Sequence, residues 1–300
     1  MKIIAVSDIH IPKNESSMPD LIRGINSSNA DVLVLGGDIA PANDPALESF
    51  LRSISGFRGK KMYICGNHDL WTVPGSSSVT GSSIERFEKV LPDIYKKFGF
   101  HSLEEQPVVY KDVGFVGNIG WYDYSLARTY SPPFGTKFVR LDDNLKPTSM
   151  VVSWGDLNTE DWKRQAFLIK GLLGMTSTAG INDRDYIVGL GDDREFCDRM
   201  RDKLEEDISV IEDSVKKIVA VFHCVPFKEG LARDNTSAEI CVRNAYAGSK
   251  YLGEVLYRHP KVRLALWGHV HKRQELMKGK IKCVNMSLDK NGKNPFELEI

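Results

Sequence analysis

The sequence has no excess of charge of either sign, because 40 lysines and arginines balance 40 aspartates and glutamates. Proteins that bind extended nucleic acid or an anionic membrane usually carry a positive surplus or a basic stripe. We therefore expect neither extended nucleic acid nor a membrane among the partners. The chain also has no apolar run long enough to cross a bilayer, and its first residues, which indicate a buried strand, lack the features of a signal peptide.

Cysteine is scarce, and its five positions are odd in number and widely spaced: Cys65, Cys197, Cys224, Cys241 and Cys283. This spacing matches neither a disulfide framework nor a thiolate zinc site. Cys65 and Cys224 lie in apolar stretches that are typical of buried strands. We therefore expect reduced thiols in the core and a cytoplasmic location.

The sequence does contain an alternation of strand and helix patterns along its 300 residues, of which 42% are hydrophobic. This length and composition can bury a large core, and we expect one domain over residues 1–300. Continuous apolar runs, which are typical of strands covered on both faces, occupy residues 1–6, 31–35, 61–64, 217–222 and 262–267. Apolar residues at helical spacing occupy residues 16–26, 47–54, 84–94, 158–168, 192–211 and 249–256. The alternation predicts an α/β fold.

Residues 120–156 differ from the rest of the chain. They combine several aromatic residues with Pro132-Pro133 and many polar side chains, without a sustained helical or strand period. We interpret this segment as a loop-rich insertion. Trp121, Tyr122 and Tyr124 could line a substrate pocket or could cover a sheet edge, and the pattern does not separate these two alternatives.

Polar side chains follow five of the predicted strands, at the points where the strands end. They are Asp8, His10, Asp38, Asn67, His68, Asp69, His223, His269 and His271. Five of the seven histidines of the chain are among them. Because ligands of α/β sheets gather beyond the carboxyl ends of the strands, we expect these side chains to share one site.

The residue types in this set favour a metal centre. Imidazole suits zinc, iron and manganese, while carboxylate and amide oxygens serve harder ions. The set is too large for one tetrahedral ion, whereas two ions about 3.5–4 Å apart with a shared carboxylate would use it. We also expect each Asp-x-His or His-x-His pair to be extended, so that both of its side chains project the same way.

The polar blocks follow a known order: Asp8-Ile9-His10, Gly37-Asp38, Gly66-Asn67-His68-Asp69, His223 and Gly268-His269-Val270-His271. In this order the sequence resembles the calcineurin-like metallophosphoesterase superfamily, over nearly the whole chain. The resemblance implies a two-sheet β-sandwich flanked by helices, in αββα layers. It also implies a metal-dependent phosphoric ester hydrolase that uses two metal ions, of manganese, iron or zinc.

Carried over residue by residue, the resemblance implies a role for each member of the set. Asp8, His10 and His271 would hold the first metal ion, and Asn67, His223 and His269 the second. Asp38 would bridge the two ions. His68 would be the general acid near the leaving group, with Asp69 orienting it, and a hydroxide between the metals would attack the phosphorus. We expect a small or nucleotide-like phosphomonoester or phosphodiester as substrate.

Two other functions remain open from the sequence. The Ser/Thr protein phosphatases of the superfamily read Gly-Asp-x-Val-Asp-Arg-Gly and Gly-Asn-His-Glu, whereas here Ile39-Ala40-Pro41-Ala42 follows Asp38 and the third block ends in Asp69. A phosphoprotein phosphatase outside that branch is the first alternative. A non-catalytic interaction scaffold of the same fold is the second, although such a scaffold would be expected to lose some of these residues.

Some residues imitate the site without belonging to it. His101 and His259 lie outside the blocks, and we expect both at the surface. Gly191-Asp192-Asp193 resembles the second block, but we interpret it as the start of a helix, where acidic residues are favourable. We expect Cys224 to point away from the site into the core.

Overall fold

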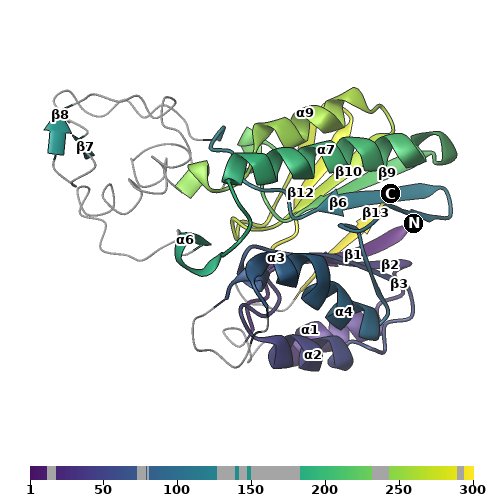
Figure 1. The fold of residues 1–300 in the computed structure, drawn as a ribbon. Coiled ribbons are helices and arrows are strands. Elements are labelled where there is room, and N and C mark those ends of the chain that lie inside the picture. The colour runs from purple at the N-terminus through teal and green to yellow at the C-terminus, as the bar shows by residue number, and fades with distance from the viewer. Residues whose placement is uncertain are drawn as a thin grey trace.

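The computed structural model describes residues 1–11, 18–72, 79, 81–126, 139–141, 147–149, 183–231, 243–288 and 294–300. Within these residues the core consists of two sheets that pack face to face between two layers of helices (Figure 1). The predicted α/β sandwich with αββα layers is confirmed. The expectation of one domain over residues 1–300 stays a prediction.

The first sheet has five strands in the order β13-β1-β2-β3-β4. Their bounds are β13 Phe296–Glu299, β1 Lys2–Val6, β2 Val32–Gly36, β3 Lys60–Ile64 and β4 Phe100–Ser102. The strands β1 to β4 run parallel, and β13 pairs antiparallel with β1. Every residue of β2 is buried, which explains its unbroken apolar sequence.

The second sheet has six strands in the order β11-β12-β10-β9-β6-β5. Their bounds are β11 Gln274–Lys278, β12 Ile281–Asn285, β10 Val262–Trp267, β9 Lys217–Phe222, β6 Val113–Asn118 and β5 Val108–Tyr110. The four inner strands are parallel and the two edge strands are antiparallel. A separate antiparallel pair joins β7 (Val139–Leu141) and β8 (Pro147–Ser149).

The helices lie on the two outer sides of the sheets (Figure 1). On one side are α1 Met18–Ser27, α2 Asp44–Ser53, α3 Ser83–Glu85 and α4 Leu91–Lys97, with the π-helical turn η3 Arg86–Val90 between the last two. On the other side are α7 Asp193–Ile211 and α9 Lys250–Arg258. Short helices are η2 His68–Leu70, α6 Asp183–Tyr186, η5 Glu212–Ser214 and η6 Lys228–Gly230.

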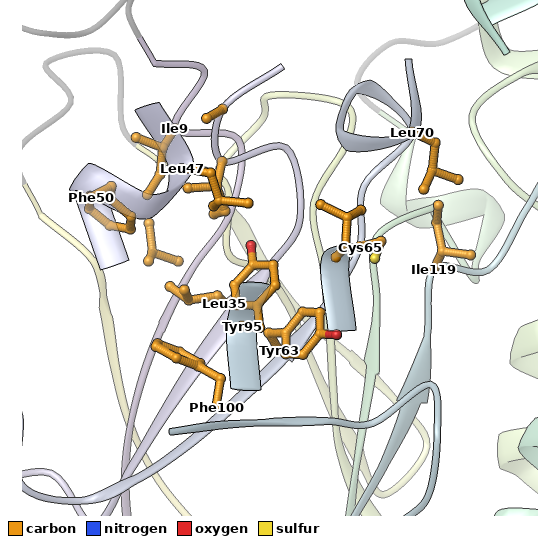
Figure 2. Close-up of a cluster of buried hydrophobic side chains, with 14 of the residues drawn as sticks. Ile9, Leu35, Leu47, Phe50, Tyr63, Cys65, Leu70, Tyr95, Phe100 and Ile119 are labelled. Atoms are coloured by element: carbon orange, nitrogen blue, oxygen red, sulfur yellow. The ribbon is translucent and has the colours of Figure 1, made fainter. Parts of the chain in front are cut away.

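Three groups of buried apolar side chains hold these layers together. One lies between the two sheets and includes Val34, Ile64 and Val221. Another packs the second sheet against α7 and α9. The third packs the first sheet against α1, α2 and α4, and Figure 2 shows part of it, with the rings of Tyr63 and Tyr95 stacked. Because both faces of each sheet are covered, the strands are held firmly and their carboxyl ends can position polar side chains.

Local capping explains where several helices begin. The Asn43 side chain accepts a hydrogen bond from the backbone N–H of Ala46 at the start of α2. Ser82 and Glu85 form a capping box at α3. Asp192 caps α7, as expected from the interpretation of Gly191-Asp192-Asp193 as the start of a helix. The strands β4 and β11 were not predicted, since β4 is only three residues long and β11 is half exposed.

The prediction for His259 was wrong. This side chain is buried, with Nδ1 3.0 Å from Glu212 Oε2 and Nε2 2.9 Å from Glu205 Oε1. The contact joins the end of α9 to α7 and to the turn after it, and the two glutamates lie more than 40 residues from His259 in the sequence. His101, on β4, is half-buried rather than a surface residue.

Several predictions fall partly outside the described residues. The helix expected over residues 158–168, the cysteine at position 241 and most of the segment 120–156 lie there. Of the other cysteines, Cys65, Cys197, Cys224 and Cys283 are free thiols and are buried. In the part of the chain that the structure describes, no helix is both long and apolar enough to cross a membrane.

Candidate metal centre

The backbone at the strand ends adopts an unusual conformation. Asp8, His10, Asp38, His269 and His271 have φ between +48° and +69°, the left-handed region that non-glycine residues rarely occupy. The expectation that the Asp-x-His and His-x-His pairs are extended was therefore wrong. Each such residue costs on the order of 1–3 kcal/mol, and the turns bring side chains of alternate residues to one place without strand geometry.

The first group of side chains comprises Asp8, His10, Asp38 and His271, whose potential ligand atoms all lie within 4.8 Å of one another. The Nε2 atoms of His10 and His271 are 3.0 Å apart. Asp8 Oδ1 lies 3.3 Å from His271 Nε2. The strands β1, β2 and β10 supply these residues from three separate parts of the chain.

The second group comprises Asn67, His223 and His269. Asn67 Oδ1 lies 2.9 Å from His223 Nε2 and 3.0 Å from His269 Nδ1. The other ring nitrogen of each histidine meets a backbone carbonyl, that of Gly36 for His223 and that of Tyr246 for His269. Each ring therefore donates to a carbonyl on one side and turns its second nitrogen toward Asn67, which is how protein scaffolds orient metal-binding imidazoles.

Asp38 lies between the two groups. Its Oδ2 is 3.5 Å from His10 Nε2 in the first group and 3.5 Å from His223 Nε2 in the second. Its Oδ1 accepts a hydrogen bond from the backbone N–H of His68 at 2.9 Å. A single carboxylate oxygen thus faces ligands from both sides, which is the placement that a bridging carboxylate requires.

Charges in the first group favour the forms that bind cations. Burial by itself raises the pKa of Asp8, but the hydrogen bond and positive charge of His271 outweigh it and hold the pKa below its ordinary value. Burial opposes ionisation of Asp38 as well, yet His223 and His68 hold its pKa well below the usual range. Burial lowers the pKa of His10 to about 4. Near neutral pH these three residues therefore present two carboxylates and a neutral imidazole, the protonation states that metal ligands need. Burial opposes a charge on His271, but the Asp8 carboxylate outweighs burial and raises the pKa of this imidazole, so a metal ion would take the place of its proton.

In the second group a metal ion would take the place of a proton. Burial disfavours a charge on His223, but the Asp38 carboxylate outweighs burial and raises the pKa of this imidazole to about 10. Burial lowers the pKa of His269 to about 4, and its neutral ring turns an unprotonated Nδ1 toward the lone pairs of Asn67 Oδ1. Two hydrogen-bond acceptors only 3.0 Å apart, His269 Nδ1 and Asn67 Oδ1, require a positively charged group that both can contact. These residues fit a metal ion, which would take the place of the proton on His223.

Neighbouring residues hold Asp8 and Asp38 in place. Asp8 Oδ2 accepts hydrogen bonds from the hydroxyls of Ser7 at 2.5 Å and Ser287 at 2.8 Å. A side chain at position 66 would put its Cβ 2.1 Å from Asp38 Oδ1, which only glycine avoids. Gly66 is therefore required by the close approach of its backbone to Asp38.

The Asp69 side chain has other partners than the predicted one, so its role in orienting His68 stays a prediction. The Asp69 carboxylate is buried and accepts hydrogen bonds from the backbone N–H groups of Gly66, Asp38 and Ile39 at 2.8–3.1 Å. Burial, together with the charge of Asp38, raises its pKa to about 6. The Asp69 carboxylate thus links the turn after β2 to the turn after β3. The His68 imidazole instead stacks on Trp71, with its Nε2 3.8 Å from Asp38 Oδ2.

Sequence reasoning missed Asp183, which lies in α6 beyond the segment 120–156. This buried carboxylate accepts hydrogen bonds from Asn67 Nδ2 and from the indole N–H of Trp71. Burial raises its pKa. No motif precedes Asp183, and its separation of 116 positions from Asn67 left no local signal that would have found it.

The aromatic residues after β6 are buried in the core. Trp121 and Tyr122 stack on each other, and Trp121 Nε1 and the Tyr124 hydroxyl both donate to Asp193. Each of the three is at most 5% exposed. The two alternatives were a substrate-pocket wall and a cover for the sheet edge, and the burial of these rings in the core disfavours an open pocket wall. The sheet-edge alternative stays a prediction. Cys224 is also buried in this core, as expected.

The fold and the cluster together define an α/β protein with a candidate metal centre at its strand ends. The sequence matches the family model described as calcineurin-like phosphoesterase over residues 1–273. The chain therefore belongs to the calcineurin-like phosphoesterase family. A search of curated protein sequences found no match.

Solved structures share the fold at low sequence identity. A phosphopantetheinyl hydrolase from Mycobacterium tuberculosis is 15% identical, with a TM-score of 0.64, and the match covers 97% of this chain and 90% of that one. A dimetal phosphatase from Danio rerio is 14% identical, with a TM-score of 0.52, over 98% of this chain and 89% of that one. At such identities these matches show that the fold is shared.

Proposed function

We propose that this protein is a hydrolase of phosphate esters that works with two divalent or mixed-valence metal ions of manganese, iron or zinc. Asp8, His10 and His271 would hold one ion, and Asn67, His223 and His269 the other. Asp38 would bridge them. The single observation that carries the proposal is the position of Asp38 Oδ2, 3.5 Å from a histidine nitrogen of each group.

The ions would acidify water and neutralise charge on the phosphoryl oxygens when bound. The chain's own residues would then position the ester and move a proton. His68 is the side chain best placed for proton transfer, because its imidazole is partly exposed at the edge of the cluster, with Nε2 3.8 Å from Asp38 Oδ2. We propose that His68 gives a proton to the oxygen of the leaving alcohol, a contribution of about 10²–10⁴-fold.

A small or nucleotide-like ester is the substrate that we propose. The balanced charge of the chain supports this choice, because it provides no field for a long polyanion. The residues after Asp38, which differ from those of the Ser/Thr protein phosphatases, also support it.

The experiment is a turnover panel with the full chain. The protein is stripped with a chelator and reconstituted separately with Mn²⁺, Fe²⁺ and Zn²⁺, and its turnover is measured on phosphomonoesters, phosphodiesters, cyclic nucleotides and phosphopeptides. We expect metal-dependent hydrolysis of small esters that is lost in Asp38→Asn. Turnover confined to phosphopeptides would favour a protein phosphatase, and no turnover with any metal would favour a scaffold.

A further inference from the structure

The side chain of Asn67 is held from behind by Asp183. Its Nδ2 donates to both carboxylate oxygens of Asp183, at 2.8 and 3.0 Å. Asp183 also accepts a hydrogen bond from Trp71 Nε1 at 2.6 Å. Both Asn67 and Asp183 are buried, at 2% and 5% exposure. The contact therefore joins α6 to the strand end that supplies Asn67.

This contact decides which way the Asn67 amide faces. A carboxamide carries an acceptor oxygen on one side and a donor nitrogen on the other. With Nδ2 on Asp183, Oδ1 faces His223 Nε2 and His269 Nδ1. The reversed amide would place Oδ1 against a carboxylate, where both partners are acceptors, and would turn its N–H groups toward the position where a metal ion needs a lone pair.

The same reversal would be favourable for one of the two histidines, His269. His269 Nδ1 carries a lone pair on the side of Asn67, so an amide N–H in that direction would make a hydrogen bond. In the absence of Asp183, His269 would thus favour the orientation that cannot bind a cation, while the N–H of His223 would favour the amide oxygen. The carboxylate opposes the preference of His269, and nothing else among the described residues bonds to Asn67 Nδ2.

We propose that Asp183 is a positioning residue that fixes the Asn67 amide with its oxygen toward the metal position shared with His223 and His269. The inference rests on the proposed function, since it needs a metal ion beside Asn67. The inference goes beyond the proposed function in one respect: the metal position beside Asn67 depends on Asp183, a residue of α6 that lies beyond the segment 120–156.

The first test measures Mn²⁺ binding by calorimetry, with Mn²⁺ as the sole ligand. In Asp183→Ala we expect one of the two Mn²⁺ equivalents to bind about 10–100-fold more weakly, as is usual when the partner of a metal ligand is removed, while the other equivalent is retained. Asp183→Asn, which keeps one acceptor oxygen and the same shape, should show a smaller loss. A circular dichroism melt of each variant verifies that it is folded.

Two matched controls separate positioning from general damage. Asp193→Ala removes another buried carboxylate that accepts hydrogen bonds from aromatic donors, Trp121 and Tyr124, and that does not bond to Asn67. Trp71→Phe removes the other donor to Asp183 and leaves the Asn67 contact. Both variants should bind two equivalents of Mn²⁺ with wild-type affinity.

The decisive test uses Asn67→Asp. A carboxylate presents oxygen on both sides and needs no orientation toward the metal position, but one of its oxygens would lie against the Asp183 carboxylate. In this background Asp183→Ala should therefore no longer weaken Mn²⁺ binding and should strengthen it. If Asp183 only supports the fold, Asp183→Ala will weaken Mn²⁺ binding in this background too, which overturns the inference. Wild-type affinity in Asp183→Ala alone also overturns it. A wild-type chain that binds no metal would instead refute the proposed function.

Discussion

The imidazole of His68 stacks on the indole of Trp71, with ring centroids 3.8 Å apart and planes inclined by 25°. The indole is itself held by its hydrogen bond to Asp183. A ring contact therefore limits the movement of His68, whereas the neighbouring carboxylate of Asp69 is committed to backbone N–H groups. This arrangement leaves the edge of the imidazole available for proton transfer.

Replacing His68 should separate catalysis from metal binding. We expect His68→Ala to keep its metal content and to lose about 10²–10⁴-fold in turnover on alkyl esters, whose alkoxide leaving groups need a proton. The loss on nitrophenyl esters should be much smaller, because nitrophenolate leaves without one. Equal losses on both ester types would remove the general-acid role. His101→Ala, on β4 outside the cluster, serves as the control.

Replacing Asp38 should affect both metal positions. In Asp38→Asn one oxygen and the negative charge between the two groups are lost, so metal content after Mn²⁺ loading and desalting should fall from two per chain to below one. Elemental analysis measures this content. Asp112→Asn, in the exposed turn between β5 and β6, should keep both ions. A content of two in Asp38→Asn would contradict the bridging assignment.

Gly66→Ala should damage the site without removing any ligand. The new methyl group would lie 2.1 Å from Asp38 Oδ1 and 2.4 Å from Asp38 N, so the carboxylate must move. We expect reduced metal content and a free energy of unfolding lower by about 1–3 kcal/mol, the usual cost of overpacking. Gly24→Ala in α1, where no atom lies within 4 Å of the added methyl, should be neutral or stabilising by about 0.5–1 kcal/mol. Unaltered metal content in Gly66→Ala would contradict the inference that position 66 must be glycine because of its close approach to Asp38.

Glu104 should make the protein less stable at high pH. Burial raises the pKa of this carboxyl, which accepts a hydrogen bond from the Cys65 N–H, to about 7. The folded state therefore binds the proton more tightly than the unfolded chain, and the stabilisation is complete below the unfolded pKa of about 4.3. It is lost as the pH rises through 7, and it amounts to about 4 kcal/mol at about 1.4 kcal/mol per pKa unit.

Glu104→Gln should lack this dependence because an amide does not ionise. Between pH 5 and pH 8 we expect its free energy of unfolding, measured with a chemical denaturant, to improve relative to wild type by up to about 3 kcal/mol. Glu105→Gln, at the exposed neighbouring position, should follow the wild-type curve. Parallel curves for Glu104→Gln and wild type would show that Glu104 is ionised in the folded protein.

Most of the fold could be predicted because its strands and helices carry strong local patterns. β2 is apolar throughout because sheets and helices cover both of its faces, and α2 and α7 begin at residues that cap them. Short or half-exposed strands such as β4 and β11 carry no such pattern, since few of their side chains face a core. The long-range pairing of His259 with Glu205 and Glu212 left no local trace either.

The sequence by itself determined which side chains could form the site, because their types and their positions after buried strands are local properties. Only the tertiary structure decided how those side chains are held. The left-handed turns at Asp8 and His10, the commitment of Asp69 to backbone N–H groups and the contact of Asp183 with Asn67 depend on packing between distant segments. The partners of a carboxylate are the groups that the fold brings within hydrogen-bonding distance. When those groups are distant in the sequence, the spacing of residues along the chain does not predict them.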